Sequence, residues 1–268
     1  MHLQPNGPVL DSFRLLRARA SYSTIVAVLA FHAALAQADA QALPDARALM
    51  EKHNAAVGGR AALDKHSSMR MTATMSVAAM GMEASMEVFR AKPNKYVQKI
   101  VLPQIGEILQ GYDGTVAWTT NPMAGAQLIT GDALEAAKSN GDFFANLQDP
   151  ANYTKAETIE LSDFEGRKCY KVKVARGTRD GFEYFDAGTG LLAGISEAQA
   201  TPQGPIAATT VFVEYGDFGG LRLPKKIEQR GGPAPPGGAT VTFTAVEFDK
   251  VDAATFDLPA AVKALLKP

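Results

Sequence analysis

Few residues of this chain have the types and spacing that covalent chemistry requires. Beyond residue 36 the sequence holds two histidines, His53 and His66, and one cysteine, Cys169. A zinc site needs several such ligands at short spacing, and the chain has no such cluster. Residues 194–198 (Gly-Ile-Ser-Glu-Ala) miss the GxSxG motif of serine hydrolases at its last position. We therefore expect no catalysis, no metal site and no cofactor, and we expect both histidines to be structural.

The cysteine and the carboxylates are the remaining groups that could take part in chemistry. Cys169 lies in a strand-like stretch and is expected to be a small buried apolar residue, and a single cysteine excludes an internal disulfide. A pair of carboxylates for glycoside hydrolysis depends on spatial arrangement, so the sequence leaves that possibility open.

Methionines are concentrated in one short segment. Methionine is flexible and polarisable, so a surface lined with it can adapt to ligands of varied shape. One alternative is ordinary core packing against the first helix. Another is Cu(I) binding by thioether sulfur, which is less favoured because no His or Cys partner lies in the segment. Six of the nine methionines of the chain form this group: Met69, Met71, Met75, Met80, Met82 and Met86.

The elements that carry these methionines have the period of β-strands. Residues 69–77 and 82–88 alternate apolar and polar side chains, which predicts a hairpin that turns near Gly81. Similar segments recur as far as residue 248, giving roughly eleven strands in meander order. The strongest turn signal is Asp113-Gly114, shortly before Trp118, whose ring suits a pocket wall or the core. A single sheet of that many strands must curl or close.

Helical patterns occur at the start and in the middle of the chain. Residues 44–57 predict a helix with Pro44 in its first turn, followed by a short helix over residues 60–66. Asp132 and Glu135 match a capping box that opens a helical insert. A second turn of this insert, from residue 142, forms either a lid over a pocket or a plug in the hollow of the sheet. Its apolar side chains are Phe143, Phe144 and Leu147.

The expected fold class is mainly β with α: a curved antiparallel sheet that forms an incomplete, half-open barrel, with helices packed in or over its concave face. Each buried CH₂ group contributes about 0.8 kcal/mol, so an acyl chain of about a dozen methylenes represents roughly 10 kcal/mol before ordering costs. An apolar concave face could shelter such a chain. The candidate ligand-binding residues are Met71, Met75, Met82, Met86, Val88, Leu109, Trp118, Phe143, Phe144 and Leu147.

The N-terminal segment predicts export. Arginines at positions 14, 17 and 19 precede an apolar run over residues 25–35, and small residues follow at Ala36 and Ala40. This order is that of a secretory signal peptide cleaved after one of those alanines, although an uncleaved anchor is the alternative. The run of about 11 residues is short of the roughly 20 that span a bilayer. We expect residues 1–36 to be removed, and residues 37–268 to form a single soluble periplasmic domain without a transmembrane segment.

The charge pattern limits the partners. The sequence has 27 basic and 28 acidic residues and no basic patch, which makes nucleic acid an unfavoured partner. The expected partner is a lipid, an acyl chain or a lipoprotein anchor. The alternative is a protein-interaction module that docks another envelope protein.

An ordered set of short segments resembles the periplasmic outer-membrane lipoprotein-sorting carriers, LolA and LolB, and their relatives, over nearly all of residues 42–268. The resemblance implies an unclosed antiparallel barrel whose concave face shelters acyl chains beneath helices and a movable lid. The absence of a cysteine at the cleavage site argues against an anchored, LolB-like receptor. The segments are Gly58-Gly59-Arg60-Ala61-Ala62-Leu63, Arg90-Ala91-Lys92-Pro93-Asn94-Lys95-Tyr96, Gly111-Tyr112-Asp113-Gly114 before Trp118, Tyr184-Phe185-Asp186, Thr189-Gly190-Leu191-Leu192, Leu223-Pro224 and Phe256-Asp257-Leu258-Pro259.

Overall fold

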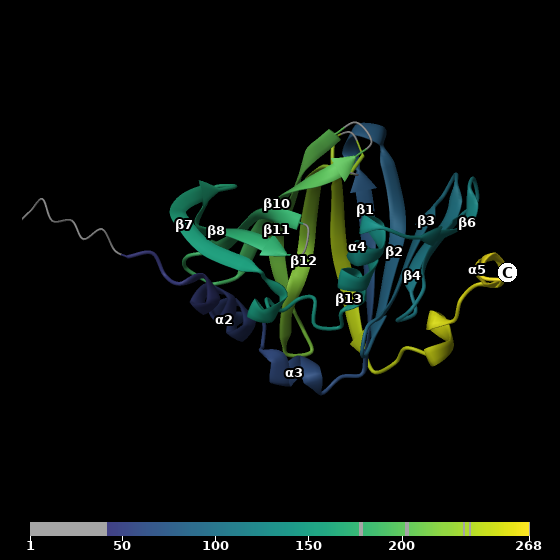
Figure 1. The fold of residues 1–268 in the computed structure, drawn as a ribbon, viewed down its shortest axis with the longest axis horizontal. Helices are drawn as coiled ribbons and strands as arrows, with labels where there is room; N and C mark the ends of the chain where they lie inside the picture. Colours follow the sequence, from purple (N-terminus) through teal and green to yellow (C-terminus); the bar gives the residue numbers. More distant parts are fainter. Residues whose placement is uncertain (1–41, 177–178, 202–203, 233, 236, 268) are drawn as a thin grey trace, which may run out of the picture. The chain divides into compact units, whose positions relative to one another are not determined.

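A computed structural model describes residues 42–176, 179–201, 204–232, 234–235 and 237–267 (Figure 1). The chain divides into two units, Met1–Ala42 and Leu43–Pro268, and all of the helices and strands that the structure describes lie in the second. The expected signal segment and both expected cleavage positions lie outside the described residues. None of the helices in the described part of the chain is long and apolar enough to cross a membrane.

The second unit is built on one antiparallel sheet of thirteen strands rather than roughly eleven. The sheet curves but does not close, because β6 and β7 are its two edges. The expected mainly β class is therefore confirmed. The strands are β1 Ser68–Val77, β2 Met82–Ala91, β3 Lys95–Leu102, β4 Gly106–Tyr112, β5 Ala117–Asn121, β6 Gly125–Ile129, β7 Lys155–Phe164, β8 Arg167–Arg176, β9 Arg179–Asp186, β10 Leu192–Thr201, β11 Gly204–Phe218, β12 Leu221–Gly231 and β13 Ala239–Phe248.

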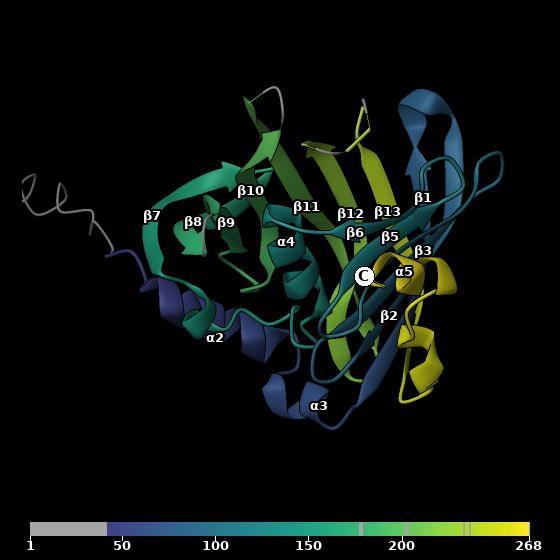
Figure 2. The ribbon, with the colours of Figure 1, turned by 45° about the vertical axis from the view of Figure 1, so that its right-hand side comes forward.

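The strand order corrects the expected simple meander. Along the sheet it runs β6-β5-β4-β3-β2-β1-β13-β12-β11-β10-β9-β8-β7, so two meanders meet where β1 pairs with β13. The consecutive strands β6 and β7 consequently lie at opposite edges. The connection between them, residues 130–154, crosses the concave side of the sheet and carries helix α4, Asp132–Gly141 (Figure 2).

The first predicted helix is confirmed as α2, Ala46–Ala56, with one correction. The Asp45 carboxylate caps it by accepting hydrogen bonds from the N–H groups of Arg47 and Ala48, so Pro44 precedes the cap rather than occupying the first turn. The helix ends at Ala56 with Val57 as its C-cap, and Gly58 and Gly59 follow with φ angles of 109° and 78°, which suit glycine. A five-residue helix, α3 Arg60–Asp64, follows.

The expected capping box of the insert is wrong. Gly131, with φ of 62°, is the N-cap of α4 and provides no side chain, so Asp132 already lies inside the first turn. Glu135 instead pairs with Lys138, its Oε1 lying 2.7 Å from the Lys138 Nζ.

The two faces of the sheet have different covers. The inner face packs against α2, α4 and the residues that follow α4. The outer face of β3–β6 is covered by the C-terminal segment, which consists of a 3₁₀ turn, η3 Ala253–Phe256, and helix α5, Ala260–Leu265.

Candidate functional site

The methionine hairpin places one apolar row on the inner face. In the β1–β2 register, Met71 lies opposite Val88, Ala73 opposite Met86, and Met75 opposite Ala84. Directly opposed residues of an antiparallel pair share a face, so these side chains form one continuous strip. The intervening polar residues of both strands face outward, as the alternation predicts.

The connection from β6 to β7 covers the part of this strip that lies away from the β1–β2 turn. Phe143 is fully buried and Leu147 is 8% exposed, and both belong to the same cluster as Met71, Met86 and Val88. Phe144 is half-buried, with the Arg60 guanidinium 4.2 Å above its ring. Of the two sequence-based alternatives, the structure gives Phe143 and Leu147 the arrangement of a plug.

His53 on α2 holds the plug in place. Its Nδ1 accepts a hydrogen bond from the Leu192 N–H at 3.0 Å, which leaves Nε2 to donate to the Asn146 carbonyl at 3.3 Å. The neighbouring Asn54 side chain makes two hydrogen bonds with the backbone of Gln148. Burial lowers the pKa of His53 to about 4. His53 is thus a satisfied structural histidine, as predicted, and neither ring nitrogen is open to a metal ion.

His66 is also engaged in structure. Its Nδ1 lies 2.7 Å from the Asp249 carboxylate, and its ring stacks on Phe248 with centroids 4.1 Å apart. Hydrogen bonds from Ser67 and His66 lower the pKa of Asp249. This contact ties the chain before β1 to the end of β13.

Trp118 and Leu109 do not join the other predicted site residues. Trp118 lies opposite Gly111, and Leu109 opposite Thr120, at positions that face outward. Trp118 is 2% exposed and packs with Phe256 of the C-terminal segment. The sequence placed these two side chains beside the methionines because their strand register was unknown.

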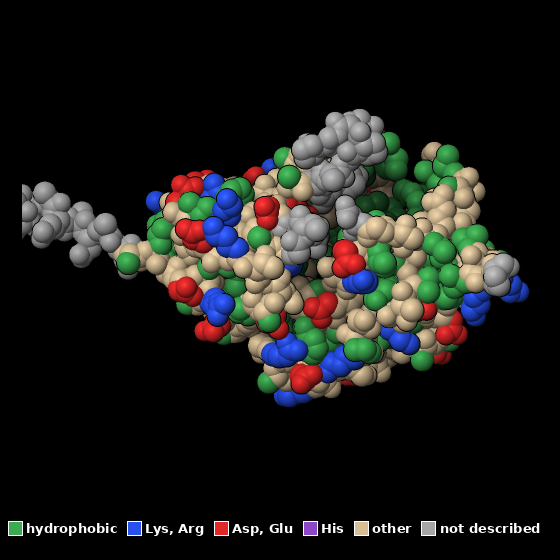
Figure 3. Space-filling model, viewed as in Figure 1, with side chains coloured by type: hydrophobic (Ala, Val, Ile, Leu, Met, Phe, Trp, Pro, Cys, Tyr) green, Lys and Arg blue, Asp and Glu red, His purple; other side chains and the backbone are tan. Residues whose placement is uncertain are grey.

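Toward the hairpin tips the inner face is only partly covered. Met75 is half-buried, and so is Met82, which lies opposite Val77. Sequence reasoning missed Ile100 and Ile108, which oppose each other across β3 and β4 and are also partly exposed. The sequence signal that could have identified them is that each isoleucine directly follows a charged residue, Lys99 or Glu107, as expected for a strand with one apolar face. Figure 3 shows a recess with hydrophobic side chains in its wall near the upper ends of the strands.

A cavity of about 310 Å³ lies at the same end of the sheet. It is bounded by the β1–β2 and β3–β4 hairpins, with Met82 and Leu102 among its apolar lining residues. The predicted site residues are therefore divided into three groups. Phe143, Leu147, Met71, Met86 and Val88 are buried together, Met75, Met82 and Phe144 are partly exposed, and Leu109 and Trp118 lie on the other face.

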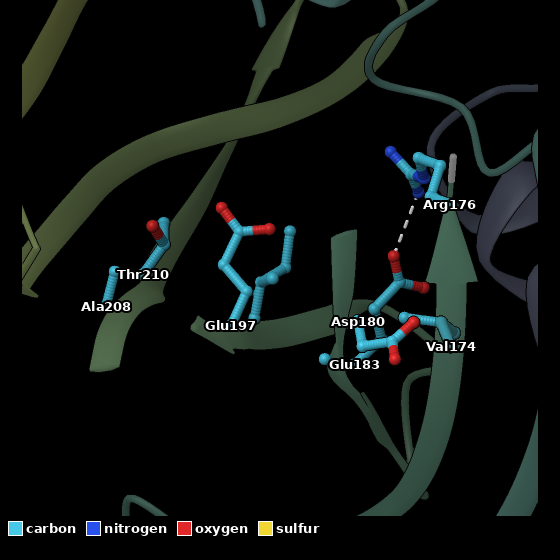
Figure 4. Close-up of a pocket in the computed structure, with 9 residues that line it drawn as sticks. Val174, Arg176, Asp180, Glu183, Glu197, Ala208 and Thr210 are labelled. Carbon is cyan, nitrogen blue, oxygen red and sulfur yellow. Dashed lines mark hydrogen bonds and ion pairs between the residues drawn. The ribbon is translucent and has the colours of Figure 1, made fainter. Parts of the chain in front are cut away.

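The inner face of β8–β11 differs in chemistry. A smaller pocket, of about 150 Å³, is lined by Val174 and Ile195 together with the charged residues Arg176, Glu183 and Glu197 (Figure 4). The sequence signal for it was a glutamate at an inward-facing position, since Glu183 has the same parity as the buried Phe185.

Glu183 is the centre of a hydrogen-bonded network in this pocket. It is 2% exposed, and its Oε1 accepts from the Tyr153 hydroxyl at 2.8 Å and from the Arg176 guanidinium at 3.0 Å. The guanidinium also lies 4.3 Å from the centre of the Tyr153 ring. Burial raises the pKa of Glu183, and the Arg176 charge opposes that shift. Tyr153, Arg176 and the Oε1 atom of Glu183 are bonded to one another, whereas Glu183 Oε2 is buried without a hydrogen-bond partner among the described residues.

Among the described residues, no group of three or more His, Cys, Asp or Glu side chains is arranged to hold a metal ion. Cys169 is fully buried, and burial raises the pKa of its thiol to about 11. A thiol in that state is a packed apolar group and a poor nucleophile.

Comparisons with known proteins identify the fold. No family model matches the sequence, and no curated protein matches it. A DUF1329 family protein from Desulfovibrio piger is similar in structure, with a TM-score of 0.56 and 10% identity over 82% of this chain and 100% of that one. A LolA superfamily protein from Nitrosomonas europaea is also similar in structure, with a TM-score of 0.55 and 9% sequence identity over 81% of this chain and 99% of that one. The resemblance inferred from the sequence is therefore confirmed at the level of the fold.

Proposed function

We propose that this protein is an exported, non-catalytic carrier that shelters the apolar part of a lipid or lipoprotein anchor on the inner face of its sheet. The observation that carries this proposal is the partly exposed row formed by Met75, Met82, Ile100 and Ile108. Such a row supplies apolar contact without any reactive group, and methionine can adjust to the guest.

The fold supports the proposal by analogy. It is shared with a LolA superfamily protein, and a LolA-like fold is typical of lipoprotein carriers. Because fold alone does not determine function, the ligand must be identified by experiment. The proposed location is the periplasm, on the strength of the signal-like order of residues 14–40.

Space on the inner face limits what can bind. Phe143 and Leu147 occupy the lower part, so a guest enters from the hairpin-tip end, where the cavity of about 310 Å³ lies. A chain that packs there gains about 0.8 kcal/mol for each methylene it buries. Binding of a single acyl chain, rather than a bulky polar ligand, fits this geometry.

The test is binding of a fluorescent fatty acid, used below its micelle concentration, to purified protein. Met75→Asp should weaken binding by at least about tenfold, because a charge in an apolar site must be desolvated. Thr74→Asp is the matched control, since Thr74 is the adjacent, exposed, outward-facing residue of β1. Equal affinity in both variants, with unchanged circular dichroism, would remove the inner face from the site.

Native mass spectrometry of protein purified from its own host separates the carrier from a protein-interaction module. Co-purified lipid that is released by denaturation supports the carrier. Lipid-free protein that instead captures one envelope protein in a defined ratio contradicts it.

A further inference from the structure

Three hairpin tips lie side by side at one end of the sheet. We call residues 78–81, 103–105 and 122–124 the rim. The cavity of about 310 Å³ is lined by both the first and the second tip. A methyl group added to Gly106, next to the second tip, would come within 3.0 Å of Pro122 in the third. The rim is therefore one continuous surface, although its parts are separated in the sequence.

The rim exposes apolar side chains to solvent. Met80 is 54% exposed, Ile105 40% and Met123 86%, one at each tip. Single exposed apolar residues are common on protein surfaces, but three on adjacent turns form a patch. Figure 3 shows hydrophobic side chains and no charged ones over the upper ends of β3 and β6, to the right of the recess.

The three rim turns contain no charged residue, and the nearest acidic side chains are those of Glu83, which also lines the cavity, and Glu107, which pairs with Lys99. Turns at the opposite end of the sheet are different: the β2–β3 turn contains Lys92 and the β4–β5 turn contains Asp113. Charged side chains therefore occur in these two turns and in none of the three rim turns.

We propose that the rim docks this protein on the surface of a lipid bilayer. Interfacial binding requires apolar side chains that can leave water and few charges that must be desolvated, and the rim meets both conditions. An uncharged patch offers a protein partner no charge complementarity. This inference goes beyond the proposed carrier function, because docking does not require a bound guest.

The rim is also joined to the proposed guest site. Met80 and Ile105 line the same cavity as Met82, an inner-face residue. A bilayer in contact with the rim would therefore lie at the entrance to the partly exposed inner face. An acyl chain could pass between them with little exposure to water.

The first experiment is flotation of the full protein with phosphatidylcholine vesicles and with vesicles that also contain phosphatidylglycerol. The protein should float with both, and the bound fraction should be insensitive to salt. Met80→Asp, Ile105→Asp and Met123→Asp should each lower the partition coefficient about tenfold. The matched control is Leu161→Asp on edge strand β7, where an equally exposed leucine (47%) lies outside the rim.

A second experiment reports insertion directly. Met123→Trp should show a blue-shifted emission on vesicle addition and quenching by brominated lipid, whereas Trp118, 2% exposed, should be quenched little. No shift and no quenching would overturn the proposal. So would vesicle binding that is lost in high salt, or binding that the three rim substitutions leave unchanged.

Three outcomes separate this inference from neighbouring ones. Met123→Asp protein that fails to float but binds monomeric fatty acid normally supports it, because Met123 does not line the guest cavity. A wild-type protein that does not float yet binds fatty acid overturns it and leaves the carrier proposal intact. A dimer in sedimentation that the rim substitutions abolish would assign the rim to a second copy of the chain, and that result would also overturn it.

Discussion

The two halves of the inner face use the same strand geometry for different chemistry. In the methionine half, formed by β1–β4 and β13, most inward positions are apolar, with Arg90, Gln98 and Gln110 as exceptions, and the chain fills part of the space with Phe143 and Leu147. In the acidic half, formed by β8–β11, the inward positions include Arg176 and Glu183, which are bonded to each other and to Tyr153.

The difference shows where a guest can be accommodated. Apolar contacts are non-directional, so one hydrocarbon group can replace another at little cost. A buried hydrogen-bonded network is directional, and breaking it leaves an unpaired polar group that costs about 1–3 kcal/mol or more. We therefore assign guest binding to the methionine half and structural rigidity to the acidic half.

The largest expected effect comes from Phe143→Ala. Phe143 is fully buried, so the substitution should lower the free energy of unfolding by about 3–5 kcal/mol in chemical denaturation. Phe144→Ala, at a half-buried position, is the control and should cost less. If Phe143 only packs in the core and does not contact the guest, folded Phe143→Ala protein should keep its affinity for fatty acid. Loss of binding in folded Phe143→Ala protein would make the plug part of the guest site.

The next effect is a pH dependence that arises from His53. Its pKa is about 4 in the folded protein and near 6.5 in the unfolded chain, so the unfolded state binds more protons as pH falls below about 6.5. Lowering the pH from 7 to 5 should therefore remove about 2 kcal/mol of stability. Protonation also removes the acceptor for the Leu192 N–H.

His53→Gln tests this assignment. Because glutamine does not titrate, the variant should be less stable than the wild type at pH 7 but should lose about 2 kcal/mol less on acidification. Urea unfolding at several pH values measures both slopes. Parallel slopes would show that His53 is not the titrating group.

An effect of opposite sign is expected from Glu183. Burial raises its folded pKa above the ordinary 4.5, so its favourable contribution is present at low pH and is lost as pH rises through the folded value. Glu183→Gln should therefore gain stability relative to the wild type between pH 4 and pH 7, as read from melting temperatures. If Glu183→Gln instead loses stability relative to the wild type as the pH rises, the ion pair with Arg176 outweighs the cost of burial. Charge attraction would then stabilise the acidic half.

Local sequence patterns predicted many of the elements. The alternation of residues 69–77 and 82–88 predicted the β1–β2 hairpin, and the helix before Gly58-Gly59 is present as α2. Asp113-Gly114 does form a turn, in which the Asp113 carboxylate accepts hydrogen bonds from the N–H groups of Thr115 and Val116. These predictions succeeded because turn chemistry and side-chain period depend on neighbours in the sequence.

The site was predicted less well, for the same reason. Leu109 and Trp118 were grouped with the methionines, yet the register of β4 and β5 turns them outward, and a shift of one residue reverses the face of every side chain in a strand. Glu183 and its partners come from separate segments that meet only in the fold.

By itself, the sequence determined that the chain forms many amphipathic strands, that its methionines share one face of a hairpin, and that it carries no recognisable catalytic motif. Tertiary structure alone decided that β1 pairs with β13, so that β6 and β7 become opposite edges and their connection crosses the hollow. The physical reason is that strand order and register depend on contacts between distant segments, whereas period, turns and caps depend on neighbouring residues. Contacts between distant segments therefore also decide how much of the hollow stays open for a guest.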